Sequence, residues 1–219
     1  MLHSLLHDWI ISWFGWVENG GYWGVIVLMA MESSIFPVPS EVVIPPAAIL
    51  AISSGKMSVT GVILAGTFGS WLGSAITYYV SLAVGRPLVE RYGKYFFIPA
   101  EKLERSERFI RRYEAGGVFF ARLLPVIRHL ISIPAGIIRM GFLKFSILTV
   151  LGAAIWCSIL AKLGAKIGEN LPKGVPLDPL RLVDAVKGES HLVIGAVALV
   201  GILYFLVMKV TASKSSVSA

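Results

Sequence analysis

The stretch SSIFPVPSEVVIPPAAILAI, residues 33–52, is apolar enough for a membrane, yet it contains four prolines and a glutamate. A proline inside a helix removes a backbone donor and clashes with the preceding turn, so a simple spanning helix is not expected here. Irregular backbone at membrane depth is tolerated only where protein or a watery cavity satisfies its polar groups. The stretch therefore predicts a re-entrant hairpin.

A second interrupted stretch, VFFARLLPVIRHLISIPAGII, occupies residues 118–138. In both stretches a proline, Pro37 or Pro125, is followed three or four residues later by a charge, and a Pro-Ala pair closes the segment. Paired interrupted segments are typical of inverted-repeat transporters, whose binding site lies near the middle of the bilayer. The second stretch therefore predicts a second re-entrant hairpin.

Long apolar runs surround the two hairpins, and each approaches or exceeds the roughly 20 residues that a spanning helix needs. They are Trp9–Met31, Met57–Val84, Phe145–Leu163 and His191–Met208. The second run places Gly61, Ala65, Gly69 and Gly73 at four-residue spacing, which predicts a face for close helix packing. We expect an all-α integral membrane protein, an inverted-repeat transporter-like bundle with two re-entrant helical hairpins and about four full transmembrane helices.

Composition and charge support a membrane protein. Of the 219 residues, 56% are hydrophobic and 15% charged, and the mean hydropathy is +0.76. The net charge of +7 arises between residues 86 and 144, a region that contains twelve Lys and Arg and five Glu. Such a basic region beside spanning segments follows the positive-inside rule and requires no nucleic-acid partner. With this region in the cytoplasm, both termini are expected to be cytoplasmic as well.

The chain 1–219 is expected to form a single membrane domain. Residues 86–117 carry charges of both signs at helical spacing, which predicts an amphipathic segment on the cytoplasmic surface. The Ser-rich tail 209–219 is expected to be disordered.

Four charges lie in apolar surroundings: Glu32, Glu41, Arg122 and Arg128. A charge at the bilayer centre costs roughly 2.5–3.5 kcal/mol on insertion scales, so such residues usually have a function. Guanidinium groups bind phosphate oxygens in a bidentate fork, so the arginines are candidates for holding a lipid phosphate. The glutamates are candidates for proton coupling or gating. The alternative is two buried salt bridges that only hold the hairpins together.

These residues resemble the DedA family, which shares the VTT or SNARE-associated domain, over roughly residues 20–165. The elements that carry the resemblance are Glu32-x4-Pro37-x-Pro39-x-Glu41, Gly66-x2-Gly69-x3-Gly73, Tyr78-Tyr79, Gly85-Arg86, Phe120-Ala121-Arg122-Leu123-Leu124-Pro125-x2-Arg128 and Pro134-Ala135-Gly136. The resemblance implies a bacterial inner-membrane protein with two facing re-entrant hairpins. It further implies translocation of undecaprenyl phosphate or phospholipid that depends on the proton gradient. It also implies that the acidic pair falls on Glu32 and Glu41 and the arginine pair on Arg122 and Arg128.

The leading hypothesis is a flippase for a phosphate-bearing lipid, with protons as co-substrate and no cofactor or metal. Hairpin geometry and helix packing are assigned to Pro37, Pro39, Pro45, Gly69, Gly73, Pro125, Pro134 and Gly136. A proton-coupled transporter for small cations or drugs is the alternative, and a membrane enzyme acting on lipid phosphates is a second. The enzyme lacks support because the sequence has no GxSxG, HExxH or P-loop motif. The sequence leaves a homo-oligomer open.

Overall fold

The computed structural model describes residues 2–34, 38–92, 118–119, 121–123, 128 and 130–170. All regular elements of these residues are helical. In chain order they are α1 (Leu2–Gly20), α2 (Tyr22–Glu32), the 3-10 turn η1 (Ser40–Val42), α3 (Ile44–Ser54), α4 (Val59–Tyr92), α6 (Ser132–Ile137) and α7 (Phe142–Glu169). The expectation of an all-α chain is confirmed for this part of the molecule.

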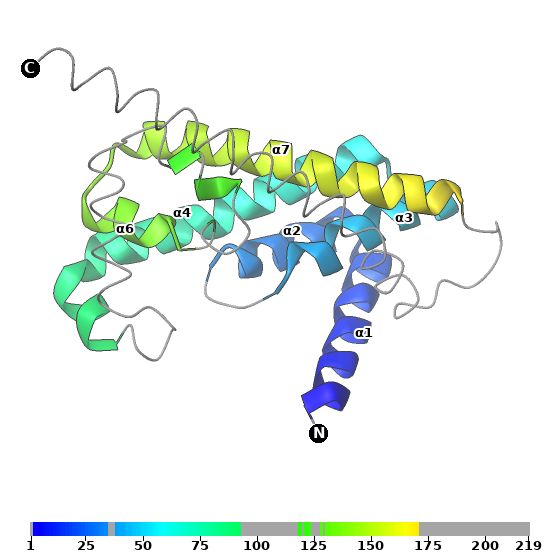
Figure 1. The fold of residues 1–219 in the computed structure, drawn as a ribbon, viewed down its shortest axis with the longest axis horizontal. Coiled ribbons are helices and arrows are strands. Elements are labelled where there is room, and N and C mark those ends of the chain that lie inside the picture. The colour runs from blue at the N-terminus through cyan, green and yellow to red at the C-terminus, as the bar shows by residue number, and fades with distance from the viewer. Residues whose placement is uncertain are drawn as a thin grey trace, which may run out of the picture.

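The long helices α4 and α7 run antiparallel to each other and form the centre of the fold (Figure 1). The ring of Tyr78 stacks on that of Phe145 with centroids 4.8 Å apart, while Gly66 lies against Cys157 further along the pair. Val59–Val84 and Phe142–Glu169 are both long and apolar enough to cross a membrane. Among the described residues, these two helices are the candidate spans.

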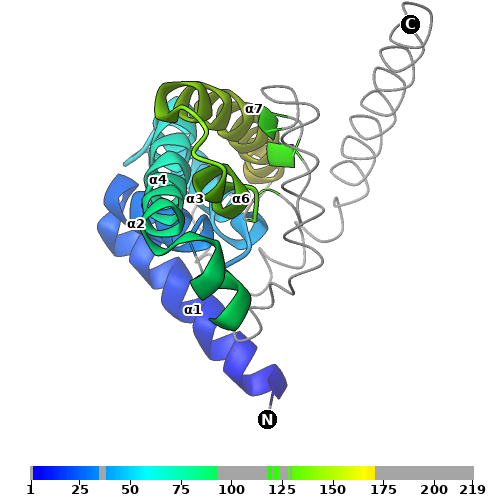
Figure 2. The same cartoon turned by 90° about the vertical axis from the view of Figure 1, so that its left-hand side faces the viewer.

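Two shorter apolar helices, α2 and α3, flank the long pair. Each has 11 residues and is therefore about 17 Å long, roughly half of a bilayer's hydrocarbon thickness. Helix α2 packs along α4 and α3 packs along α7, and the view turned by 90° shows this arrangement end-on (Figure 2). Pro45 and Pro46 lie in the first turn of α3, where a missing N–H breaks no intrahelical hydrogen bond.

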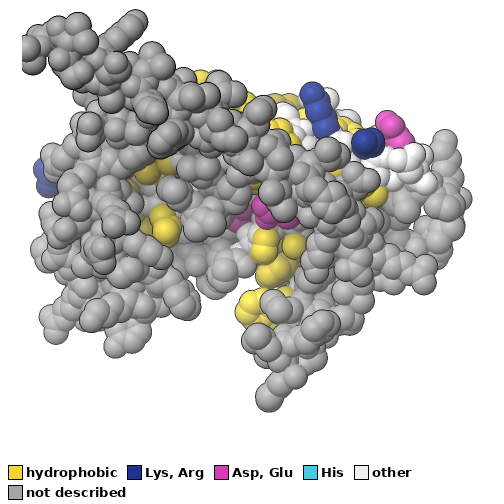
Figure 3. Space-filling view, viewed as in Figure 1, with side chains coloured by type: hydrophobic (Ala, Val, Ile, Leu, Met, Phe, Trp, Pro, Cys, Tyr) yellow, Lys and Arg dark blue, Asp and Glu magenta, His cyan; other side chains and the backbone are white. Residues whose placement is uncertain are grey.

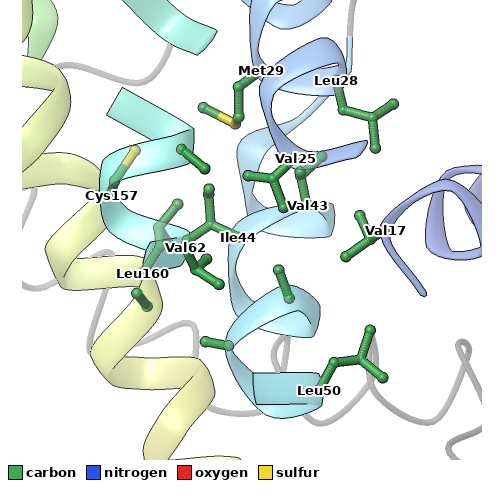
Figure 4. Packing of buried hydrophobic residues seen from close by; sticks show 14 of the residues in the cluster. Val17, Val25, Leu28, Met29, Val43, Ile44, Leu50, Val62, Cys157 and Leu160 are labelled. Atoms are coloured by element: carbon green, nitrogen blue, oxygen red, sulfur yellow. The ribbon is translucent and has the colours of Figure 1, made fainter. Parts of the chain in front are cut away.

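The core joins these helices through side chains that all point inward. Val25 of α2, Ile44 of α3, Val62 of α4 and Leu160 of α7 are completely buried and converge in one cluster (Figure 4). Fully burying such a side chain stabilises a protein that has an aqueous exterior by about 1.5–3 kcal/mol. In a membrane, packing rather than water exclusion holds such a cluster together, which makes close helix approach decisive.

The predicted spanning helix Trp9–Met31 is wrong as a single helix. It divides at Gly21, whose φ of 54° no helix interior adopts, and α1 leaves the bundle at an angle to α2 (Figure 1). Helices α1 and α2 pack tightly beside the bend, since a Cβ on Gly24 would lie 2.1 Å from the carbonyl oxygen of Trp16. The run Asn19-Gly20-Gly21 is a turn signal that identifies this break in the sequence.

Other boundaries also differ from the prediction. Helix α4 continues to Tyr92, so the first residues of the segment 86–117 extend a long helix instead of starting a separate one. The rest of that segment, the predicted span His191–Met208 and the tail 209–219 lie outside the described residues.

Close approach of α2 to α4 gives a first testable prediction. A Cβ added at Gly73 would lie 2.1 Å from the carbonyl oxygen of Ala30, so Gly73→Ala must push the two helices apart. We expect it to lower the free energy of unfolding by about 1–3 kcal/mol, measured by denaturation in mild detergent. Gly15→Ala is the matched control: nothing lies within 4 Å of its Cβ position. It should raise stability by up to about 1 kcal/mol through helix propensity. Equal effects at both glycines would contradict the packing.

Candidate functional site

Arg128 and Glu32 form a buried ion pair between the two interrupted segments. The Glu32 Oε1 atom that accepts from Arg128 also accepts from the backbone N–H of Ser40 at 3.1 Å. The guanidinium group lies over the ring of Trp156, 5.3 Å from its centroid, and the Trp156 Nε1 donates to Ser40 Oγ at 3.1 Å. The pair is thus held by three elements, and it fixes the end of α2 against the second segment.

Arg122 is buried in a different way, because its partners are neutral. Its Nη1 donates to Ser74 Oγ and its Nη2 to Ser132 Oγ, both at 2.8 Å, and its guanidinium carbon lies 5.6 Å from the centroid of the Phe145 ring. The side chain is 3% exposed, and Nε has no hydrogen-bond partner. Within the described part of the chain no carboxylate pairs with Arg122. Counted over the described residues, the two arginines and Glu32 leave one positive charge of the site without a carboxylate partner.

Hydroxyl groups connect the two arginine environments. Ser33, next to Glu32, shares a hydrogen bond of 2.8 Å with Ser70. Ser74 donates to the carbonyl oxygen of Ser70 at 2.6 Å and accepts from Arg122. Both Arg128 and Glu32 also lie within electrostatic reach of Arg122. The arginines, one glutamate and these serines thus form a single buried polar region, which we call the charge site.

The charge site lies near the middle of the two candidate spans. Ser74 is close to the midpoint of Val59–Val84, and Trp156 is at the midpoint of Phe142–Glu169. Among the described residues in the space-filling view, acidic atoms are visible near the middle of this face and again at its upper right, beside two basic groups (Figure 3). Arg122 and Arg128 are at most 5% exposed, so the site is closed in this conformation.

The remaining predicted charge, Glu41, does not join the ion pair. It lies half-buried in η1, one residue after Ser40, and makes no ion pair within the described residues. Of the two buried salt bridges in the alternative hypothesis, the described residues form one, between Glu32 and Arg128.

The prolines and glycines assigned to hairpin geometry occupy element boundaries or helix contacts where they are described. Pro39 precedes η1, Pro45 and Pro134 lie in the first turns of α3 and α6, and Gly69, Gly73 and Gly136 face the backbones of Ile26, Ala30 and Tyr78. Pro37 and Pro125 lie outside the described residues.

Sequence reasoning missed the hydroxyl groups of the charge site. Helix α4 carries a buried row of them, at alternating spacings of three and four residues: Thr67, Ser70, Ser74, Thr77 and Ser81. This spacing marks one face of a helix, so a polar face inside an otherwise apolar span was detectable. The hydrogen bond between Ser74 and Arg122 could not be predicted in this way, because the two residues are 48 positions apart in the sequence.

Comparison with known proteins places these residues in a family. Residues 38–166 match the VTT domain. The chain is 36% identical to undecaprenyl phosphate transporter A of Bacillus subtilis over 90% of this chain and 93% of the relative. It is 28% identical to undecaprenyl phosphate transporter A of Staphylococcus aureus, over 70% of this chain and 77% of the relative. It is also 32% identical to an alkaline phosphatase-like protein of Lactococcus lactis, over 84% and 86%. No solved structure matches the chain.

Proposed function

The chain belongs to the VTT domain family, the DedA family that its motifs resemble, and from this premise we propose that it moves a phosphate-bearing lipid between the leaflets of a bacterial membrane. Undecaprenyl phosphate is the first candidate and a phospholipid the second. Two similar proteins are named as undecaprenyl phosphate transporters, which supports a transporter and this lipid.

The observation that carries the proposal is the charge of Arg122, which pairs with no carboxylate in the described ranges of the chain. Buried charges are normally paired, because an isolated ion loses its hydration and gains nothing in return. The contacts of the Arg122 guanidinium group with other described residues are hydrogen bonds to two serine hydroxyls and a cation–π contact with an aromatic ring. A phosphate brought beside it would supply the missing negative charge and accept charge-assisted hydrogen bonds. A cation would meet repulsion, which disfavours the cation or drug transporter.

The helix lengths support a lipid substrate that stays partly in the membrane. We propose that α2 and α3 are the arms of the first re-entrant hairpin and that residues 118–138 form the second, with α4 and α7 as full spans. The headgroup would then bind where the hairpin ends meet, near the midplane, while the apolar tail remains in lipid. Because the charge site is closed, loading requires at least one hairpin to move.

Glu32 is suited to couple this movement to protons. One of its oxygens binds Arg128 and Ser40, whereas Oε2 has no hydrogen-bond partner within the described ranges. A protonated Glu32 no longer neutralises Arg128, which is then available to the lipid phosphate. Deprotonation restores the ion pair and expels the headgroup. Glu41, closer to the exterior of the site, would exchange the proton with water.

The basic residues between positions 86 and 144 support an orientation with the C-terminal end of α4 and the N-terminal end of α7 in the cytoplasm. Both termini of the chain are then cytoplasmic if α1 and the segment His191–Met208 each cross the membrane. In this orientation the first hairpin enters from the outer side and the second from the cytoplasmic side. The opposite entry sides are what an inverted repeat produces.

The proposal is tested with the full chain in lipid vesicles and a fluorescent polyprenyl phosphate. We expect the protein to accelerate transfer of this lipid between leaflets, and an imposed pH gradient to change its final distribution. A probe with the same tail and a trimethylammonium headgroup is the matched control and should not be accelerated. Equal transfer of both probes would contradict recognition of the phosphate. Release of inorganic phosphate would indicate an enzyme instead, and a pH change on adding small cations would indicate cation exchange.

A further inference from the structure

Thr149 of α7 has a buried hydroxyl group that makes no hydrogen bond to the part of the chain that the structure describes. Its side chain is 0% exposed, and Oγ1 has no hydrogen-bond partner. Burying a hydroxyl without a partner is unfavourable, and a threonine in a helix can usually donate to a carbonyl one turn earlier. The Thr149 hydroxyl makes neither this backbone hydrogen bond nor one to another described side chain, so it is available to a ligand.

The position of Thr149 on α7 brings this hydroxyl to the charge site. Phe145 lies one turn before it and Gly152 one turn after it, so the three share one helix face. Both neighbours touch the same side chain: Arg122 lies over the Phe145 ring, and a Cβ on Gly152 would lie 2.5 Å from the Arg122 Cβ. Thr149 therefore faces Arg122, whose Nε is also without a partner.

The remaining N–H groups of Arg122 and the Thr149 hydroxyl together match the three terminal oxygens of a phosphate monoester. A guanidinium group has five N–H donors, and the two serine hydroxyls take one each, which leaves Nε–H and an adjacent N–H for a bidentate contact. Such a contact engages two phosphate oxygens. A phosphate monoester offers the Thr149 hydroxyl a third terminal oxygen, whereas a diester offers it only the two terminal oxygens that the guanidinium group already engages.

We propose that Thr149 binds the third terminal oxygen of a phosphate monoester held by Arg122 and so selects monoesters over diesters. This rests on the proposed function and narrows it to a lipid monophosphate such as a polyprenyl phosphate. Phosphodiester lipids, which form the bulk of the surrounding bilayer, are bound more weakly.

The test compares two ligands with the same polyprenyl tail, the monophosphate and its methyl diester, in binding to the purified full chain in detergent. The wild-type protein should prefer the monophosphate. Thr149→Val keeps the side-chain shape and removes only the hydroxyl. It should weaken binding of the monophosphate at least about tenfold, the effect of one hydrogen bond to a charged group, and leave the diester within about twofold. Its unfolding temperature should not fall, since the hydroxyl has no partner to lose.

Ser146→Ala is the control within the same helix. The Ser146 hydroxyl is also buried without a partner, but it lies about a quarter turn around α7 from the face that meets Arg122. This variant should bind both ligands as the wild type does. Unchanged monophosphate binding by Thr149→Val, or equal losses for both ligands, would overturn the role of Thr149. Wild-type protein that binds neither ligand would instead contradict the proposed function itself.

Discussion

Replacing Arg128 with methionine is expected to destabilise the protein more than any other single change in the charge site. The substitution leaves the Glu32 carboxylate buried, with Ser40 N–H as the one partner of Oε1 and none for Oε2. Removing one partner of a buried ion pair typically costs about 3–5 kcal/mol, because the remaining charge is desolvated and uncompensated. We expect a loss of this size in the free energy of unfolding, measured by denaturation in detergent, together with loss of lipid transfer.

A double-mutant cycle separates the ion pair from packing. Glu32→Gln keeps a side-chain oxygen for Ser40 and Arg128 but removes the charge, so on its own it should be less harmful than Arg128→Met. The double variant has no buried charge at these positions and should recover most of the lost stability, since neutral replacements of buried pairs are often tolerated. Additive losses would show that the two residues do not depend on each other. Transfer of lipid should stay abolished in the double variant, because Arg128 is absent.

The sequence predicted the helices, their interruptions and the charges in apolar surroundings, because each of these signals is local. Proline chemistry located the interruptions, and the insertion cost of charge identified Glu32, Arg122 and Arg128 as unusual. Both kinds of signal depend on a residue and its immediate neighbours. They do not depend on how distant helices are aligned.

The choice of partner could not be predicted in this way. Glu32 ends α2 and Glu41 lies nine residues later in η1, but among the described residues Glu32 alone meets Arg128, 96 positions away. Which glutamate reaches the arginine is decided by the position of α2 along α4, and the contact of Gly73 with Ala30 fixes that position. A shift of one helical turn, about 5.4 Å, would separate the pair.

The break at Gly21 and the hydroxyl of Thr149 were missed for different reasons. The turn signal at Gly21 was present but was outweighed by the continuous hydropathy of Trp9–Met31. A threonine in a spanning helix carries no signal, because most of them bond to their own backbone. Only its missing partner makes Thr149 notable, and that appears once the packing is known.

Replacing Arg122 with methionine is expected to separate activity from stability. Methionine fills a similar apolar volume and removes a buried charge that has no carboxylate partner in the described chain, so stability should be unchanged or rise by up to about 1–4 kcal/mol. Ser74 still donates to the Ser70 carbonyl without the arginine, so its hydroxyl is not stranded. Transfer of the polyprenyl phosphate should fall at least about a hundredfold, because two charge-assisted hydrogen bonds to the phosphate are lost.

Arg122→Lys is the informative comparison, since it keeps the charge and loses the planar fork. We expect its transfer rate to lie between those of the wild type and Arg122→Met, and its preference for monophosphate over diester to disappear. A methionine variant that unfolds several kcal/mol more easily would identify Arg122 as a structural residue. A stable methionine variant that still transfers lipid would remove the phosphate from the mechanism. A methionine variant that is stable but no longer transfers lipid would support the proposal that the lipid phosphate balances the charge of Arg122.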